Sequence, residues 1–433
     1  MKKILAFALA ACMAFALCAC GQNAAPATDP DDADEIALTV WTWDKNVDAI
    51  EEAARQYNEL TGKNISLDVQ ITAKPDVLSG IVACSESGDT SSLPDITMMG
   101  DTDFFSYGAT YTDLFYDMTD YVDWTQVAAA KANLTALNNR HYGVPFDSGS
   151  VCALYRVDIL EEAGYSLDDL TDITWDRAIE IGADVYAKTG HYLYVDQPGC
   201  INMLKIMLFS SGVPLFNEDG SANLAGNPAA VKALETLKKG VDNKAIYVAS
   251  DWDDYNAALT TGDVTAGVVN GCWIANNVNT YEENALKWDT TNAPKLSDIE
   301  TATGYANNGG SSWYVLNTGD KCDEAAKFLA YMFAGEGMNS FVDYITNDIG
   351  YVITYAPVVE SNYYDKVDDG FYAPGFWTKL AATSLKAPLF NGSPLFAATN
   401  TALPSVSEEV LNGADIEATL TKYQETLDFE FGK

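Results

Sequence analysis

Residues 36–71 read IALTVWTWDKNVDAIEEAARQYNELTGKNISLDVQI, and this stretch sets the pattern of the fold. Residues 36–43 are rich in β-branched and aromatic side chains, which favours a strand. Apolar residues then recur at helical spacing from 47 to 60, and Gly62 follows as a stop signal. Apolar side chains alternate over 65–71, which indicates a second strand. Because the order strand, helix, strand recurs later in the chain, we expect an α/β fold with mainly parallel sheets.

The start of the chain has the pattern of a secretion leader. Two lysines at positions 2–3 precede an uncharged apolar run over 4–17, which is shorter than the roughly 20 residues that span a bilayer. The run ends in Leu-Cys-Ala-Cys at 17–20, which resembles the bacterial lipobox. We therefore expect a lipoprotein signal peptide at 1–19 and a diacylated Cys20 that holds the protein outside the cytoplasm on the cell membrane. The alternative is an ordinary signal peptide cleaved nearby, with an incidental cysteine.

The segment that follows the leader differs from the rest of the chain. It contains glycine, glutamine, asparagine, proline, threonine and acidic residues, and no apolar face can be drawn on it. We therefore expect 20–36 to be a flexible lipidated tether. The remaining chain, about 400 residues, is longer than one hydrophobic core usually serves, so two domains are expected.

Composition excludes some function classes. The formal net charge of −37 repels phosphate backbones, so we expect no binding to nucleic acid. No cysteine stands in a Cys-x-x-Cys pair, so buried free thiols are expected rather than a zinc site or a disulfide framework. The Asp-Trp-Asp-Asp sequence at 251–254 lacks the spacing of a calcium-binding loop and is interpreted as a helix start. No metal and no cofactor are expected.

Several short motifs occur in a fixed order along the chain, namely Thr39-Val40-Trp41-Thr42-Trp43-Asp44, Pro94-Asp95-Ile96, Tyr142-Gly143-Val144-Pro145 with Leu154-Tyr155, Thr174-Trp175-Asp176, Gly262 to Trp273, and Gly309-Gly310. In this order they resemble the extracellular solute-binding proteins of sugar importers, the group that includes maltose-binding protein. The resemblance covers nearly all of the mature chain. It departs at Arg156-Val157, where Tyr-Asn is usual, and at Cys272-Trp273, where Gly-Pro-Trp is common.

This resemblance implies a two-lobed α/β fold of the type II periplasmic-binding-protein class, with the ligand in the cleft between the lobes. Carried over to this chain, the N-terminal lobe would be 37–146 and 284–317, and the C-terminal lobe 147–283 and 318–433. Ligand binding would close the lobes by a hinge motion.

The resemblance also implies a function. The protein would capture a carbohydrate, an oligosaccharide rather than a monosaccharide, and deliver it to the permease subunits of an ABC importer. It would act as a monomer held at the membrane by its lipid.

A sugar presents hydroxyl groups around its rim and C–H faces above and below, so its site needs aromatic surfaces and planar polar groups. Trp273 stands at the family's Gly-x-Trp position, whose indole stacks on the sugar; packing between lobes is the alternative. Trp41 and Trp43 lie at the carboxyl end of the first strand, where open α/β sheets place ligands, although alternation favours a core position for at least one. Trp313 is either a wall of the site or packed in a strand. Gly309-Gly310 would let backbone amides approach the ligand, but a simple turn would look the same.

Four polar residues are also expected at the cleft. Asp44 follows the first strand, where capping of a helix is the alternative. Asp101 lies just beyond the Pro-Asp-Ile strand, where family members place a sugar-binding acid, and a turn-forming aspartate is the alternative. Asp147 sits in an expected crossover segment, as a ligand contact or as a hinge cap. Gln197 is expected in a loop, where a glutamine is ordinary whether or not it contacts the ligand.

The sequence gives little support to catalysis. His141 and His191 are the only histidines, and neither adjoins a nucleophile motif. The motifs GxSxG, HExxH and GxxxxGK do not occur. We therefore expect a binding protein and not an enzyme. A surface glycoside hydrolase or lyase, which needs only two carboxylates, remains an alternative, as does a polysaccharide-binding adhesin.

Overall fold

The structure is a computed structural model and describes residues 35–43, 45–261, 263–280, 282–390, 392–430 and 432. The predicted signal peptide, Cys20 and the tether up to residue 34 lie outside these residues, as does Asp44. Residues 37–433 form one compact unit, within which two sheets carry separate sets of helices.

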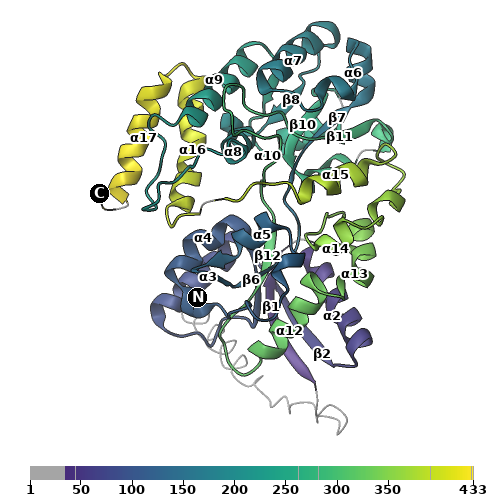
Figure 1. The fold of residues 1–433 in the computed structure, drawn as a ribbon, viewed down its shortest axis with the longest axis vertical. Helices are drawn as coiled ribbons and strands as arrows, with labels where there is room; N and C mark the ends of the chain where they lie inside the picture. Colours follow the sequence, from purple (N-terminus) through teal and green to yellow (C-terminus); the bar gives the residue numbers. More distant parts are fainter. Residues whose placement is uncertain are drawn as a thin grey trace, which may run out of the picture. The chain divides into compact units, whose positions relative to one another are not determined.

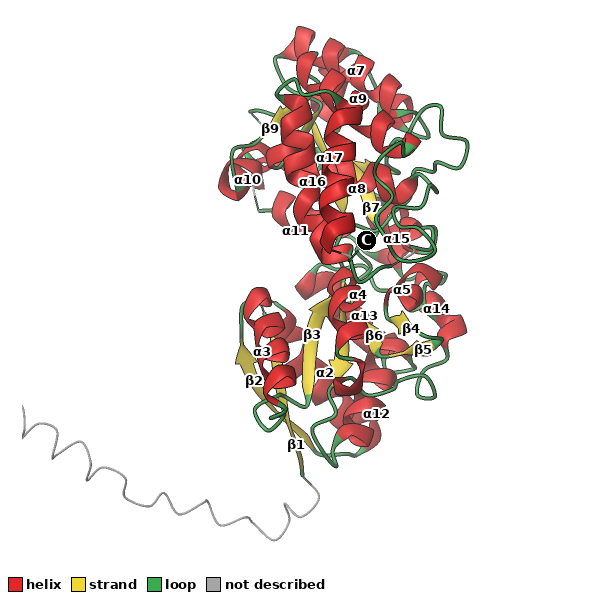
Figure 2. Ribbon diagram, turned by 90° about the vertical axis from the view of Figure 1, so that its left-hand side faces the viewer, coloured by secondary structure: helices red, strands yellow, loops and turns green. Residues whose placement is uncertain are grey.

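The first sheet has five strands, and Figure 2 shows three of them, β1, β2 and β3, side by side. In spatial order they are β2 (Ile65–Ile71), β1 (Ile36–Thr42), β3 (Ile96–Gly100), β12 (Ser311–Val315) and β6 (Gly143–Pro145). β1 and β3 pair in parallel, as a strand–helix–strand unit requires. β12 runs antiparallel to both of its neighbours.

The second sheet is antiparallel throughout. Its order is β10 (Gly267–Gly271), β7 (Val151–Arg156) and β11 (Trp288–Thr291). Two smaller sheets have two short strands each. One pairs β4 (Ala136–Leu137) with β5 (Arg140–His141), and the other pairs β8 (Tyr194–Asp196) with β9 (Ile246–Val248). The expectation of mainly parallel sheets is therefore wrong for this sheet and for β12. Consecutive strands are expected to be parallel when a crossover helix joins them within one sheet. β12 does not meet this condition, because the strand before it, β11, belongs to the second sheet.

Helices cover each sheet separately. The first sheet carries α2 (Asn46–Thr61), α3 (Lys74–Ser87), α4 (Asp101–Thr110), α5 (Ala129–Leu134), α12 (Cys322–Ala334) and α13 (Met338–Tyr344). The second sheet and the β8–β9 pair carry α6 (Val157–Ala163), α7 (Trp175–Thr189), α8 (Ile201–Ser210), α9 (Pro228–Asp242), α10 (Trp252–Thr260), α11 (Ala275–Val278) and α15 (Phe376–Ser384). α14 (Ala356–Val359) contacts α13 and α15, while α16 (Phe396–Leu411) and α17 (Ile416–Glu430) pack against α9, as Figure 1 shows. Among the described helices, none combines the length and the apolar character needed to cross a bilayer.

The predicted helix over 47–60 is confirmed as α2. Its apolar side chains at helical spacing, among them Ile50 and Tyr57, are buried. The helix ends at Gly62, whose φ of 72° is a left-handed conformation that glycine adopts without strain. The Gly62 N–H donates to the Asn58 carbonyl at 2.9 Å. The local sequence therefore accounts for the buried face of this helix and for its C-terminal end.

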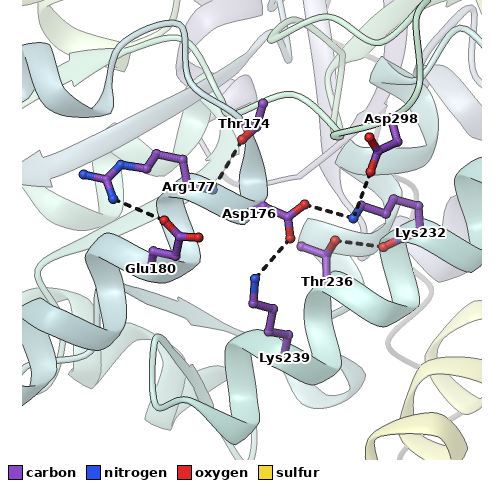
Figure 3. Close-up of polar contacts among 8 residues, drawn as sticks. All are labelled: Thr174, Asp176, Arg177, Glu180, Lys232, Thr236, Lys239 and Asp298. Carbon is purple, nitrogen blue, oxygen red and sulfur yellow. Dashed lines mark hydrogen bonds and ion pairs between the residues drawn. The ribbon is translucent and has the colours of Figure 1, made fainter.

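The Thr-Trp-Asp motif stands at the start of α7. The Thr174 side chain caps the helix by accepting a hydrogen bond from the Arg177 N–H at 3.3 Å. Figure 3 shows Asp176 facing two lysines of α9, Lys232 at 2.9 Å and Lys239 at 3.4 Å. Burial raises the pKa of Asp176, but the hydrogen bond from Lys232 and the other contacts lower it more, to about 2. The motif thus joins α7 to α9 through a partly buried ion pair.

Two segments pack on a different sheet from the one that the expected lobe boundaries assign to them. β11 falls within the expected N-terminal segment 284–317, but it hydrogen-bonds to β7 of the second sheet and its Trp288 is fully buried there. α12 falls within the expected C-terminal segment 318–433, but its buried face packs on β6 and β12 of the first sheet. Strand pairing and burial of the apolar helix face override the boundaries carried over from the family.

The segments that pass between the sheets pair with one another. Asp147 forms an antiparallel bridge with Ile353, and Ser150 forms one with Asn307. The chain therefore crosses near 146–150, near 292–310 and near 350–355, and isolated β-bridges join these segments (Figure 1).

The five cysteines of the described chain are all buried with free thiols, as expected, and are Cys84, Cys152, Cys200, Cys272 and Cys322.

Candidate functional site

A cavity of about 410 Å³ lies beside the crossing segments and takes residues from the helices and loops that follow the strands of both sheets. It is lined by aromatic rings, amides, a carboxyl group and an amine, contributed by Trp43, Lys45, Asn46, Asp147, Trp252, Trp273, Asn276, Asn277, Gly310, Ser311 and Tyr351. We call it the tryptophan cleft. Flat aromatic surfaces beside directional polar groups suit a ligand with apolar faces and hydroxyl groups around them.

Trp273 is positioned by the end of a buried strand. It follows β10 in a short 3-10 helix, and its indole N–H donates to the Asn308 carbonyl of a crossing segment at 2.9 Å. The ring is partly exposed and lies 6.4 Å from the Trp252 ring, centroid to centroid, at an interplanar angle of 36°. Trp252 stacks in turn on Tyr255 at 5.4 Å and keeps 44% of its surface exposed. These two indoles form one aromatic wall of the cleft.

Trp43 belongs to the wall contributed by the first sheet. It follows β1 directly, and its carbonyl accepts a hydrogen bond from the Asn46 N–H at 3.3 Å at the start of α2. Trp41 faces the same side of the strand but does not line the cleft. Its indole donates to the Gln70 side chain at 3.0 Å and packs over Gly80, where a Cβ would lie 2.8 Å from the ring.

Asp147 is the carboxyl group at the bottom of the cleft. It is 5% exposed, and its Oδ1 accepts a hydrogen bond from the Ser311 N–H at 2.7 Å. Burial raises the pKa of Asp147 to about 6; nearby Asp101 adds to this effect and Lys131 opposes it. At neutral pH the cleft therefore presents a carboxylate with strong acceptor character.

The raised pKa predicts how stability depends on pH. Between the ordinary value of 3.8 and about 6, folded Asp147 holds a proton that the unfolded chain has released. The free energy of unfolding should therefore fall as pH rises through this window. Asp147→Asn removes the effect and should raise stability at neutral pH by on the order of 1–3 kcal/mol.

Urea unfolding of both proteins across this pH window measures the difference. Asp196 has a pKa that burial also raises to about 6, but it is present in both proteins and cancels in the comparison. Stability curves that run parallel for the two proteins would contradict the raised pKa of Asp147.

A buried ion pair lies directly under the cleft. Asp101, the first residue of α4, contacts Lys131 of α5, and both side chains are fully buried. Asp101 Oδ1 also accepts a hydrogen bond from the Ser312 hydroxyl at 2.7 Å. Gly310 separates this pair from the cleft, because a Cβ there would lie 2.6 Å from Asp101 Oδ2 and 2.7 Å from the Lys131 amine. Asp101 thus lies beneath the lining instead of in it.

The glycine pair allows close approach at this point. Gly309 and Gly310 have φ values of 85° and 89°, which side chains rarely tolerate. A Cβ at Gly309 would lie 2.8 Å from the Trp273 indole nitrogen. Gly309 therefore lets Trp273 reach the crossing segment, and Gly310 itself lines the cleft.

Two expected residues lie elsewhere. Trp313 is fully buried among Phe146 and Phe333, because its position on β12 points into the core of the first sheet. Gln197 lies in the loop after β8, where its N–H donates to Asp196, and it does not line the cleft. Asp44 lies outside the described residues.

The sequence did not point to several residues that line the cleft. Trp252 lies in the Asp-Trp-Asp-Asp stretch, which is a helix start as predicted, since Asp251 accepts from the Asp254 N–H at 2.9 Å. An indole between acidic residues at a helix start is a signal of exposure that could have identified it. Asn276, Asn277 and Tyr351 gave no such signal.

A family model described as bacterial extracellular solute-binding protein matches residues 52–367. The chain belongs to this family. The lactose-binding protein of Rhizobium radiobacter is 36% identical to it over 387 residues, which are 88% of this chain and 90% of that protein. The maltooligosaccharide ABC transporter solute-binding lipoprotein of Streptococcus pneumoniae is 21% identical over 357 residues, which are 81% of this chain and 80% of that protein.

The fold of this extracellular solute-binding protein also occurs in solved structures. The cyclic α-maltosyl-1,6-maltose binding protein from Arthrobacter globiformis matches with a TM-score of 0.72 at 19% identity, over 91% of this chain and 98% of that one. The expected type II periplasmic-binding-protein fold is thereby confirmed.

Proposed function

We propose that this extracellular solute-binding protein captures an oligosaccharide in the tryptophan cleft and delivers it to the permease of an ABC importer. The observation that carries the proposal is the lining itself, in which Trp43, Trp252 and Trp273 surround one cavity with asparagines and Asp147 between them. Indole faces pack on the C–H faces of a sugar, and amides and carboxylates exchange hydrogen bonds with its hydroxyls. The names of the lactose-binding and maltooligosaccharide-binding relatives support a carbohydrate ligand.

Calorimetric titration with lactose, maltose, maltotriose and an arabinose trisaccharide tests the proposal. We expect at least one of them to bind and to raise the melting temperature, because a ligand that binds only the folded state stabilises it. A protein that binds none of these sugars and shows no thermal shift would contradict the proposal.

The cleft supports binding more than hydrolysis. Among the described residues that line it, Asp147 is the one carboxyl group, and Asp101 is buried beneath in its ion pair with Lys131. A glycosidase needs two carboxylates on opposite sides of the scissile bond. We therefore expect each sugar to be recovered unchanged after incubation with the protein. New reducing ends or shorter products would favour the glycoside hydrolase alternative.

Lobe closure is part of the proposed mechanism. The paired crossing segments, with the bridges Asp147–Ile353 and Ser150–Asn307, are the proposed hinge. Solution X-ray scattering should show a smaller radius of gyration when the bound sugar is saturating. An unchanged profile at saturation would argue for a rigid site.

Anchoring at Cys20 completes the proposal. The lipobox-like sequence at 17–20 supports it, as does the lipoprotein relative of Streptococcus pneumoniae. Cys20→Ala should move the protein from the membrane fraction to the medium, or block its processing, because the acyl chains supply the membrane affinity. A Cys20→Ala protein of mature length that still sediments with membranes would rule out lipidation at this residue.

A further inference from the structure

The two indoles of the aromatic wall, Trp273 and Trp252, lie at different depths of the tryptophan cleft. The Trp273 indole donates to the Asn308 carbonyl of a crossing segment, and a Cβ at Gly309 would lie 2.8 Å from its ring nitrogen. Trp252 reaches the cleft from the first turn of α10 and keeps 44% of its surface exposed. Trp273 therefore forms the inner part of the wall and Trp252 the outer part.

The two indole planes differ in orientation. Their centroids lie 6.4 Å apart, and the planes are inclined to each other by 36°. A single flat sugar ring therefore cannot lie parallel to both indoles at once. Two sugar units can each lie on one indole, because rotation about the glycosidic bond lets their rings tilt relative to each other. Both aromatic faces are therefore used only by a ligand of at least two units.

The outer indole is held in a fixed position by the protein itself. Its ring stacks on the buried Tyr255 at 5.4 Å and 23°, which covers one face. The Asn256 side chain donates to the Trp252 carbonyl at 2.9 Å, and the Asn277 side chain donates to Asn256 at 2.7 Å. These amides join α10 to α11, which begins two residues after Trp273. Binding to an indole that is already ordered loses little conformational entropy.

Polar groups accompany both indoles. The crossing segment that contacts Trp273 continues to Ser311, whose N–H donates to Asp147 at the bottom of the cleft. Asn277 also lines the cleft and is joined to the Trp252 turn through Asn256. Its NH₂ group donates to Asn256, and its carbonyl oxygen can accept a hydrogen bond from a hydroxyl group. The cleft thus combines an aromatic face with a hydrogen-bond acceptor in its inner part and again in its outer part.

We propose that Trp252 makes this protein select sugars of two or more units over monosaccharides. The inner unit lies on Trp273 near Asp147, and the next unit lies on Trp252 near Asn277. A monosaccharide occupies the inner position alone, so Trp252 adds nothing to its binding. This inference rests on the proposed function and deepens it, because it names the residue that recognises the second sugar unit.

The test measures affinities for two disaccharides, lactose and maltose, and for two monosaccharides, galactose and glucose, by calorimetry. Weak monosaccharide binding is measured by displacement of the disaccharide that wild type binds more tightly. Wild type should bind that disaccharide at least about tenfold more tightly than either monosaccharide. Trp252→Ala should lower its affinity by about tenfold or more and change monosaccharide affinity by less than about threefold.

Two further variants make the comparison specific. Trp124→Ala is the matched control, because this indole is also partly exposed but stacks on His141 at 3.8 Å and does not line the cleft. It should leave every sugar affinity at the wild-type value. Trp252→Phe keeps a flat ring and should retain most of the preference for the disaccharide. If Trp252→Ala does not fold, Trp252→Leu, which keeps an apolar side chain without a ring, takes its place.

Equal losses of disaccharide and monosaccharide affinity in Trp252→Ala, or no loss of either, would overturn the role of Trp252. The same loss in Trp124→Ala would also overturn it, since a general effect of removing an indole would then explain the change. A wild type that binds monosaccharides as tightly as disaccharides, or binds only the trisaccharides, would contradict this inference while sugar capture stands. A wild type that binds no sugar would contradict the proposed function and this inference with it.

Discussion

Trp273→Ala should weaken sugar binding by about thirtyfold or more, which corresponds to about 2 kcal/mol or more, while the protein stays folded. The indole is partly exposed in the cleft, which Trp43 also lines, and its position beside Trp252 makes it a central aromatic anchor. Its hydrogen bond to the Asn308 carbonyl orients the ring. Because the ring lines a cleft instead of filling the core, its removal should leave the melting temperature almost unchanged.

Calorimetry and thermal melting of Trp273→Ala separate the two roles of this residue. Trp273→Phe keeps an aromatic face without the N–H and should lose less affinity. Trp313→Ala is the contrasting variant, since removal of a fully buried ring should cost about 3–5 kcal/mol of stability. A collapse of the melting temperature in Trp273→Ala, or an unchanged sugar affinity, would remove Trp273 from the proposed site.

Lys131→Met should destabilise the fold by about 3–5 kcal/mol. Both Lys131 and its partner Asp101 are fully buried, so loss of the amine leaves a carboxyl group with no compensating charge. The double variant Lys131→Met with Asp101→Asn should recover most of the loss, because a neutral amide can still accept the hydrogen bond from Ser312. Urea unfolding of the wild type, both single variants and the double variant forms a complete double-mutant cycle.

The cycle distinguishes an ion pair from simple packing. An ion pair predicts a large coupling energy and a double variant that is more stable than Lys131→Met alone. Additive losses in the double variant would show that Lys131 stabilises the fold mainly by filling space.

Local sequence was sufficient for the elements whose pattern is short. The helix from Asn46 to Thr61 and the strands beside it follow from apolar spacing and from Gly62, because these signals lie within one segment. The sheet partner of Trp288 could not be predicted in the same way. It pairs with Arg156, more than a hundred residues earlier, and nothing in the local pattern of either strand specifies that pairing.

For the site as well, some residues could be predicted from the sequence and others depend on tertiary contacts. Trp43 was identified from its position at the end of the first strand, and Asp147, Trp273 and Gly310 from the resemblance to sugar-binding proteins; all four line the cleft. Asp101 was expected in the cleft and lies just beneath its lining. Its side chain contacts Lys131, thirty residues away, and the sequence did not indicate that this lysine is buried. Trp252 reaches the cleft because α10 packs beside α11, a tertiary contact with no local signature.

The buried cysteines have a practical consequence. Each of the five thiols is enclosed by the fold, so an alkylating reagent can reach them only when the protein opens around them. Two of them lie close to the aromatic wall of the cleft: Cys152 is on β7, and Cys272 directly follows β10 and precedes Trp273. The rate at which these two thiols are alkylated, measured by mass spectrometry, therefore reports how often the sheet beside the cleft opens. A bound ligand that stabilises this sheet will lower the alkylation rate, so unknown sugars can be screened without any engineered probe.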